Sequence, residues 1–236
     1  MVETPPLFSA VCRALVRAGL PLGELSDVDL FEVIAATAEW VGPEAGPEVD
    51  PRPVAEELED RLSGGWFAEP TPSEAQAHFS VAPEPPRVAL VRPEPGSTRV
   101  FDDKPLGAWW TSSRLPDGTS CWSRSESLVG TPETRAAGEV PQRREHWVTV
   151  DLAAARIHRI ERAADFAVLL AEYPLGGSGF PRVDWLAVAE DFDAVHLSAR
   201  GLVYTQDVPI ATDRGTSALR GWNCESTAWL TEPRLR

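Results

Sequence analysis

The apolar positions at the start of the chain have the period of an α-helix. Leu7, Val11 and Leu15 lie four residues apart, so they share one helix face. Gly19 follows them, and glycine commonly ends a helix because it adopts the left-handed backbone conformation without strain. The pattern therefore predicts a first helix that ends at about residue 18.

Two further helices are predicted before residue 66. Ser26 and Asp29 have the spacing of a capping box, and the helix after them would run through Trp40. Asp50-Pro51 places a capping residue before a proline at a helix start, and Gly64-Gly65 would end that helix. Residues 1–66 are thus expected to form a helical N-terminal unit.

The composition then changes. Residues 67–87 contain five prolines, which favours a linker, and we place a boundary there. Residues 88–236 are expected to form a second domain.

Short strand-like runs dominate this second domain. They are rich in β-branched and aromatic residues, and they are interrupted by two helical patterns, at 161–173 and 184–191. The expected strands are 88–92, 107–113, 146–150, 157–160, 194–198, 202–205 and 221–230. This order predicts an α+β fold, in which the helical unit is followed by a split, mostly antiparallel sheet.

Charge and cysteine content argue against binding to nucleic acid or membranes and against a disulfide-bonded protein. The 236 residues carry a formal net charge of -14, which disfavours duplex nucleic acid and anionic membranes as partners. The three cysteines, Cys12, Cys121 and Cys224, are far apart and predict free thiols in a reducing compartment. The N-terminus lacks a signal-peptide pattern and no apolar run could span a bilayer, so we expect a cytoplasmic protein.

The last strand-like run contains the most informative acid. Glu225 stands among aromatic, small and apolar residues. Because side chains of a strand alternate between faces, Glu225 would share a face with Asn223 and Thr227. One interpretation is a solvent-facing glutamate on an edge strand. The other is a catalytic carboxylate held in a cleft, which requires partners from elsewhere in the chain.

Two earlier strands supply such partners. Arg92 ends the apolar run 88–92, and Thr111-Ser112-Ser113 ends the aromatic run that begins at 107. A strand cation, strand hydroxyls and a late-strand glutamate, in this order, resemble the Arg–Ser–Glu pattern of the ADP-ribosyltransferase fold. The segments 104–112 and 221–227 are also similar to a group of uncharacterised phage and actinobacterial proteins, a similarity that implies no activity.

The resemblance implies NAD as the substrate. Arg92 would bind the diphosphate through paired hydrogen bonds. Thr111 and Ser112 would orient the nicotinamide ribose and the glutamate. Trp110 or its neighbour Trp109 would offer a flat face to a ring. Glu225 would stabilise the positive charge that develops on the ribose as the nicotinamide bond breaks.

The resemblance also assigns a role to the position two residues before the glutamate. There the family usually has Glu or Gln, which helps to position the acceptor. Asn223 is shorter and cannot act as a base, so the acceptor is not identified. Trp110 stands where the hydroxyl motif usually begins with Ser, and Arg87 and Arg99 are alternatives to Arg92.

The leading hypothesis is therefore an enzyme that cleaves NAD and passes ADP-ribose to an unknown acceptor or to water. An alternative is a non-catalytic acidic protein that binds a basic protein partner, and a third is a hydrolase of nucleosides. No metal site is expected, because the four histidines, His78, His146, His158 and His196, lack the spacing of metal ligands.

Overall fold

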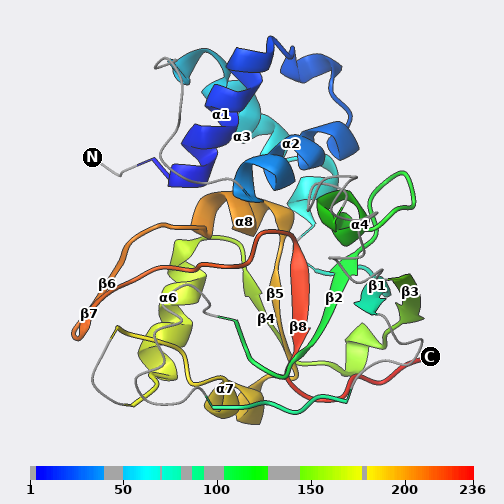
Figure 1. Ribbon diagram of the computed structural model, residues 1–236, viewed down its shortest axis with the longest axis vertical. Coiled ribbons are helices and arrows are strands. Elements are labelled where there is room, and N and C mark those ends of the chain that lie inside the picture. Colours follow the sequence, from blue (N-terminus) through cyan, green and yellow to red (C-terminus); the bar gives the residue numbers. More distant parts are fainter. Residues whose placement is uncertain are drawn as a thin grey trace, which may run out of the picture.

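The computed structural model describes residues 4–39, 50–69, 71–80, 87–92, 104–126, 144–176 and 180–236. These residues form an α+β fold in which N-terminal helices precede a mixed, mostly antiparallel sheet of six strands. Figure 1 shows the helices at one end of the molecule and the sheet at the other. The fold class predicted from the pattern change is thus confirmed at this level.

The helical unit contains α1 (Pro6–Ala18), α2 (Asp27–Glu39) and α3 (Arg52–Leu62), with the short 3-10 helices η1 (Leu22–Glu24) and η2 (Gly65–Ala68). Gly19 and Ser26 mark the end of α1 and the start of α2 as predicted, whereas Trp40, the predicted end of the second helix, lies outside the described residues. Gly19 caps α1 with a φ of 61°. The Ser26 hydroxyl accepts a hydrogen bond from the Asp29 amide, and the Asp29 carboxylate accepts one from the Ser26 amide in return.

The sheet has the strand order β3-β1-β2-β8-β5-β4. All neighbouring strands are antiparallel except β4 and β5, which are parallel. The strands are β1 (Ala75–Ser80), β2 (Trp109–Ser113), β3 (Arg144–Thr149), β4 (Ile157–Ile160), β5 (Ala194–Leu197) and β8 (Ser226–Trp229). A separate hairpin consists of β6 (Ile210–Thr212) and β7 (Gly215–Ser217).

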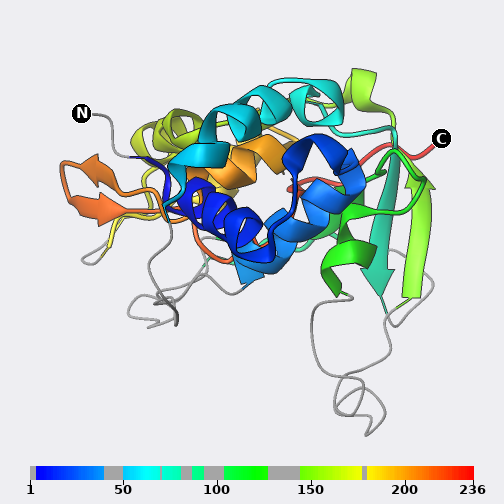
Figure 2. The same cartoon turned by 90° about the horizontal axis from the view of Figure 1, so that it is seen from above.

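The remaining helices surround the sheet. They are α4 (Cys121–Glu126), η3 (Leu152–Ala154), α6 (Ala163–Glu172), α7 (Trp185–Asp191) and α8 (Ala199–Thr205). Figures 1 and 2 show α8 between the helical unit and the sheet. Phe8 of α1 stacks on Tyr204 of α8 with ring centroids 5.7 Å apart.

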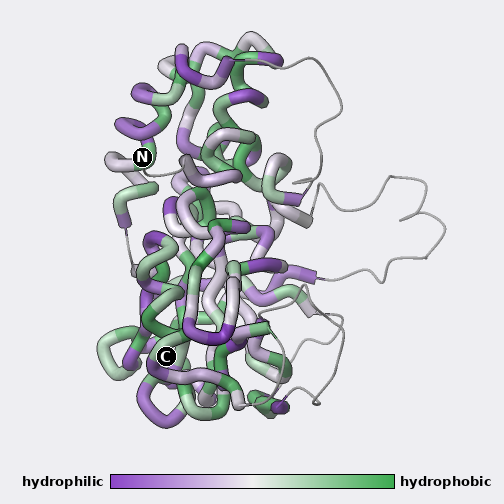
Figure 3. The backbone as a smooth tube through the Cα atoms, turned by 90° about the vertical axis from the view of Figure 1, so that its left-hand side faces the viewer, coloured by the Kyte–Doolittle hydropathy of each residue, from purple (hydrophilic) through white to green (hydrophobic). Residues whose placement is uncertain are grey.

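One continuous apolar core joins the helical unit to the sheet domain. It includes Leu15 and Ile34 from the helices and Val195 and Leu197 from β5, all fully buried. In Figure 3 hydrophobic stretches of the backbone, coloured green, occur both in the helical unit and in the sheet domain. The helical unit is therefore packed against the sheet domain, which allows it to contribute to a site there.

Two regions differ from the sequence-based expectation. Within residues 67–87, Ala75–Ser80 forms β1, which pairs with β2 on one side and β3 on the other. Its central residues Gln76 and His78 are buried although they are polar, so the segment lacks the apolar signature of an inner strand. The run 88–92 forms no strand, although the Ala89 and Val91 amides donate to the Gly107 and Leu106 carbonyls.

The prediction of a strand at residues 202–205 is wrong, because these residues belong to α8. The Ser198 hydroxyl accepts a hydrogen bond from the Gly201 amide and caps the helix. A Cβ atom on Gly201 would lie 1.8 Å from the Ile160 carbonyl oxygen. Glycine is therefore required here by the close approach of α8 to β4, and it does not mark a turn between strands.

Alternation divides the side chains of β2 between the two faces of the sheet. Trp109, Thr111 and Ser113 share one face, and Trp110 and Ser112 share the other. Thr111 pairs with Thr227 of β8, so Glu225, two residues before Thr227, comes opposite Ser113. This register brings the end of β2 and the start of β8 together at one edge of the sheet.

Candidate active site

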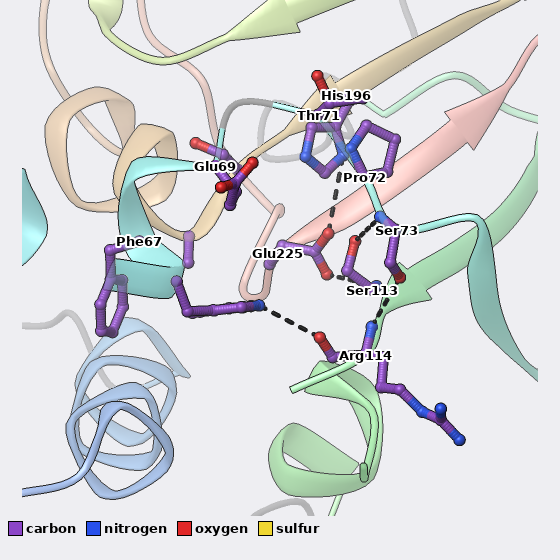
Figure 4. A pocket seen from close by; sticks show the side chains of 12 residues that line it. Phe67, Glu69, Thr71, Pro72, Ser73, Ser113, Arg114, His196 and Glu225 are labelled. Atoms are coloured by element: carbon purple, nitrogen blue, oxygen red, sulfur yellow. Dashed lines mark hydrogen bonds and ion pairs between the residues drawn. The ribbon is translucent and has the colours of Figure 1, made fainter. Parts of the chain in front are cut away.

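A pocket of about 310 Å³ lies at this edge. The ends of β2 and β5 and the residue before β8 contribute Ser113, His196 and Glu225. The opposite wall comes from η2 and the segment that leads to β1, with Trp66, Phe67 and Glu69. Figure 4 shows Glu225 at the centre of this arrangement, with His196 and Ser113 around its carboxylate.

Glu225 is a buried carboxylate whose two oxygens differ. Its side chain is only 2% exposed. Oε2 accepts a hydrogen bond of 2.9 Å from the backbone amide of Ser113. No described residue hydrogen-bonds to Oε1, and the nearest ring nitrogen, His196 Nδ1, is 3.7 Å away. A buried acceptor without a partner is costly, so Oε1 is available to a ligand hydroxyl.

Burial decides the protonation of this pair. It raises the pKa of Glu225 to about 7, although hydrogen bonds from Ser113 and Cys121 act in the opposite direction. Burial also lowers the pKa of His196 to about 3, so this imidazole is neutral near pH 7. Glu225 therefore changes charge close to neutral pH, as a residue in acid–base or electrostatic catalysis requires.

His196 is held by the strand next to Glu225. It pairs with Thr227 between β5 and β8, and its Nδ1 lies 3.0 Å from the Thr227 hydroxyl oxygen. Directly opposite residues share a face, so His196, Thr227 and Glu225 lie on the same side of the sheet. The pocket floor is thus built from rigid strands.

Of the hydroxyls predicted from the sequence, Ser113 reaches the pocket. Its hydroxyl oxygen accepts a hydrogen bond from the Ser73 amide, and its own amide contacts Glu225. Ser112 lies on the other face, where it accepts from the Trp122 amide. Thr111 is buried further along the strand, and its hydroxyl donates to Gln76.

The predicted ring platform also lies on the other face of β2. Trp110 packs edge-on against Trp222 with ring centroids 4.8 Å apart, and the ammonium group of Lys104 lies 5.7 Å from its ring centre. Trp110 thus packs against the main apolar core and does not line the pocket.

The structure does not bring Arg92 and Glu225 together. The guanidinium of Arg92 is exposed and makes a 2.7 Å ion pair with Asp184 at the start of α7. Arg87 is exposed and does not line the pocket, and Arg99 lies outside the described residues. The arginine that lines the pocket is Arg114, which directly follows β2.

Asn223 is also placed away from the pocket. Its amide nitrogen donates a 2.9 Å hydrogen bond to Glu39 of α2. The extended strand expected over residues 221–230 is shorter, because β8 begins at Ser226. Asn223 therefore lies outside the strand, and the prediction that it shares a strand face with Glu225 does not apply.

Sequence reasoning missed His196, Trp66 and Phe67. His196 is 29 residues from Glu225 and becomes its neighbour only through the β5–β8 pairing. Trp66 and Phe67 fall at the end of the helical unit, where no chemistry was expected. Strand alternation could have identified Ser113 as the pocket hydroxyl in place of Ser112, because Ser113 shares a face with Thr111 and Ser112 does not.

Two kinds of feature are absent from the described residues. They contain no group of three or more histidine, cysteine or acidic side chains that could hold a metal ion. In the same part of the chain, no helix combines the length and apolarity needed to cross a bilayer.

Comparisons with known proteins identify no relative: no protein-family model matches the chain, and no curated protein or solved structure shows significant similarity to it. The function must therefore be argued from the pocket.

Proposed function

We propose that the protein cleaves NAD at the bond between nicotinamide and ribose, with Glu225 as the catalytic carboxylate. The observation that carries this proposal is the pairing of Glu225 with Ser113, which joins a late-strand glutamate to the hydroxyl-bearing end of the neighbouring strand. This pairing resembles the Ser–Glu part of the pattern of the ADP-ribosyltransferase fold, which the sequence also resembles.

The chemistry suits the two oxygens of Glu225. As the bond from the ribose carbon to the ring nitrogen breaks, its electron pair leaves with nicotinamide and the ribose becomes oxocarbenium-like. Oε1 would accept a hydrogen bond from the adjacent ribose hydroxyl, while Ser113 holds Oε2. The negative carboxylate then stabilises the developing positive charge. Attack by an acceptor oxygen, which loses its proton, completes the reaction.

Arg114 is the cation that we assign to the diphosphate in place of Arg92. It lines the pocket and is exposed, and its guanidinium stacks at 5.1 Å from the Trp147 ring centre on β3. A stacked guanidinium keeps its in-plane donors directed outward, which suits phosphate oxygens. In Figure 4 its side chain points away from Glu225, so a bound diphosphate would lie several ångströms from the cleaved bond.

Water is the acceptor that we propose. The residue two positions before the glutamate, Asn223, is engaged with Glu39 and does not line the pocket. A side chain that would position a protein acceptor is thus missing from this place. The proposed activity is that of an NAD glycohydrolase within an ADP-ribosyltransferase-like fold.

The test is nicotinamide release from NAD by the purified full-length chain, measured by chromatography. We expect release by the wild type, with Arg114→Ala raising KM severalfold and Arg92→Ala leaving kcat and KM unchanged. A wild type that neither binds nor cleaves NAD would end the proposal and leave the acidic interaction protein as the alternative. Loss of activity in Arg92→Ala but not Arg114→Ala would overturn the assignment of the cation.

A further inference from the structure

The outer wall of the pocket comes from the helical unit. Trp66 and Phe67 belong to η2, and Glu69 follows it. Trp66 is fixed from three sides: its ring nitrogen donates a 3.2 Å hydrogen bond to the Arg114 carbonyl, and its ring packs edge-on against Phe31 and Phe67, with centroids 5.6 and 5.1 Å away. A rigid aromatic side chain of this kind offers contact area at low entropic cost.

The acidic side chains of the pocket and its arginine lie in different parts of it. Among the residues that the structure describes, five titratable side chains surround Glu225 or line the pocket with it, namely His196 on β5, Arg114 after β2, Cys121 on α4, Cys224 beside it in sequence, and Glu69 on the outer wall. His196 is neutral near pH 7 and burial raises the pKa of the Cys121 thiol, so neither offsets a carboxylate. Arg114 directs its guanidinium toward Trp147. The inner pocket is therefore negative when Glu225 is ionised, which is the case above a pH of about 7.

We infer that this wall selects a flat ring that carries a positive charge, held between Trp66 and the carboxylates of Glu69 and Glu225. The inference rests on the proposed function for its identification of the ring as the pyridinium of NAD. A cation against an aromatic side chain gains electrostatic attraction, and the attraction grows when water is excluded. The ionised Glu225 carboxylate adds a negative charge, and its Oε1 has no hydrogen-bond partner among the described residues.

Charge selection of this kind also favours product release. When the bond breaks, its electron pair stays on the ring nitrogen and the positive charge of the pyridinium disappears. Free nicotinamide is neutral and loses its attraction to both carboxylates. The wall therefore binds the substrate ring more tightly than the product ring.

The experiment compares two probes of nearly equal shape on the full-length chain. They are 1-methylnicotinamide, which is a cation, and nicotinamide, which is neutral, and binding is measured by broadening of their NMR signals. At pH 8 the cation should bind roughly fivefold or more tightly. The preference should fall at pH 5.5, where Glu225 is protonated, while binding of the neutral probe stays constant.

Three variants test the wall. Trp66→Leu and Glu69→Gln should each lower the preference for the cation severalfold, and Trp66→Phe should keep part of it. Glu56→Gln is the matched control, because Glu56 is exposed on α3 and does not line the pocket but its substitution changes the net charge equally. Thermal melting of each variant verifies that it is folded.

Equal affinity for the two probes, or no binding of either at millimolar concentration, would overturn the inference. An unchanged preference in both Trp66→Leu and Glu69→Gln would do the same. If these results accompany NAD cleavage by the wild type, the inference fails and the proposed function stands. If the cation binds selectively but NAD is neither bound nor cleaved, the inference stands and the proposed function fails.

Discussion

Buried polar groups in two parts of the β2–β8 strand pair differ in whether they have hydrogen-bond partners. In the middle, the Thr111 hydroxyl contacts the Gln76 side-chain oxygen, and the Trp229 ring nitrogen donates to both at 3.0 and 3.3 Å. At the pocket end, Glu225 is equally buried but no described residue bonds to its Oε1. A closed network stabilises a fold, whereas an open acceptor destabilises it. The difference separates the structural part of this strand pair from the part that we assign to chemistry.

The hydrogen-bonded network of Thr111, Gln76 and Trp229 should contribute the larger share of the stability. Trp229→Ala removes a fully buried indole and two hydrogen bonds, and it should lower the free energy of unfolding by about 3–5 kcal/mol. Trp147→Ala, which removes a 39% exposed indole on β3, should cost about 1 kcal/mol or less. Urea unfolding measures both, and a loss for Trp229→Ala no larger than that for Trp147→Ala would show that the buried network around Trp229 does not stabilise the fold.

Glu225→Gln, unlike Trp229→Ala, should raise the free energy of unfolding. The pKa of Glu225 is 4.5 in the absence of its surroundings and about 7 in the fold. Below pH 4.5 both the folded and the unfolded chain hold the proton. Between pH 4.5 and 7 the unfolded chain loses its proton while the folded chain keeps it, so the free energy of unfolding falls across this range. At pH 8 the folded chain buries an anion, and the full cost is roughly 3 kcal/mol. The glutamine variant avoids this cost.

We therefore expect Glu225→Gln to be more stable than the wild type at pH 8, by up to roughly 3 kcal/mol, and equally stable near pH 4.5. Urea unfolding at the two pH values gives the comparison. A variant that is less stable at pH 8 would show that the charge of Glu225 supports the fold.

Ser113 and Ser112 are neighbours on opposite faces of the sheet. The Ser113 side chain helps to lower the pKa of the Glu225 carboxyl, so Ser113→Ala should lower kcat about tenfold. Ser112→Ala removes only the acceptor of the Trp122 amide and should leave kcat within about twofold, with a stability loss of about 1 kcal/mol. Steady-state NAD cleavage and urea unfolding of both variants test this, and an exchange of the two phenotypes would refute the face assignment.

Asn223→Ala should have the smallest effect. It removes a partly buried hydrogen bond to Glu39, which is worth about 0.5–1 kcal/mol. The rate of nicotinamide release should not change. A clear fall in transfer of labelled ADP-ribose to an added acceptor, with hydrolysis intact, would restore Asn223 to an acceptor role.

Local signals in the sequence predicted part of this molecule well. The helix boundaries follow from capping residues such as Gly19 and Ser26, because a cap acts over a few neighbouring residues. The change to short strands after residue 88 predicted the α+β class. The β1 strand was assigned to a linker, because its buried residues Gln76 and His78 are polar and prolines flank it.

The site was predictable only where it depended on one strand. Glu225 stood out as a lone acid in an apolar run, and Thr111-Ser112-Ser113 contained the correct hydroxyl. His196 and Trp66 reach Glu225 through strand pairing and helix packing between distant parts of the chain, which no local pattern encodes. Arg92 was chosen from its place at the end of an apolar run, but its ion pair with Asp184 spans 92 residues of sequence.

We infer that the negative charge of Glu225 drives the proposed cleavage of NAD. The most direct test is the rate of nicotinamide release from saturating NAD, measured from pH 5.5 to 8.5 for the wild type and Glu225→Gln. We predict that the wild-type rate rises with pH and levels off above a pKa near 7, as the carboxylate becomes ionised. Glu225→Gln should bind NAD but release nicotinamide roughly 100- to 1000-fold more slowly at pH 8. A glutamine variant as active as the wild type would show that the charge of Glu225 does not contribute to cleavage.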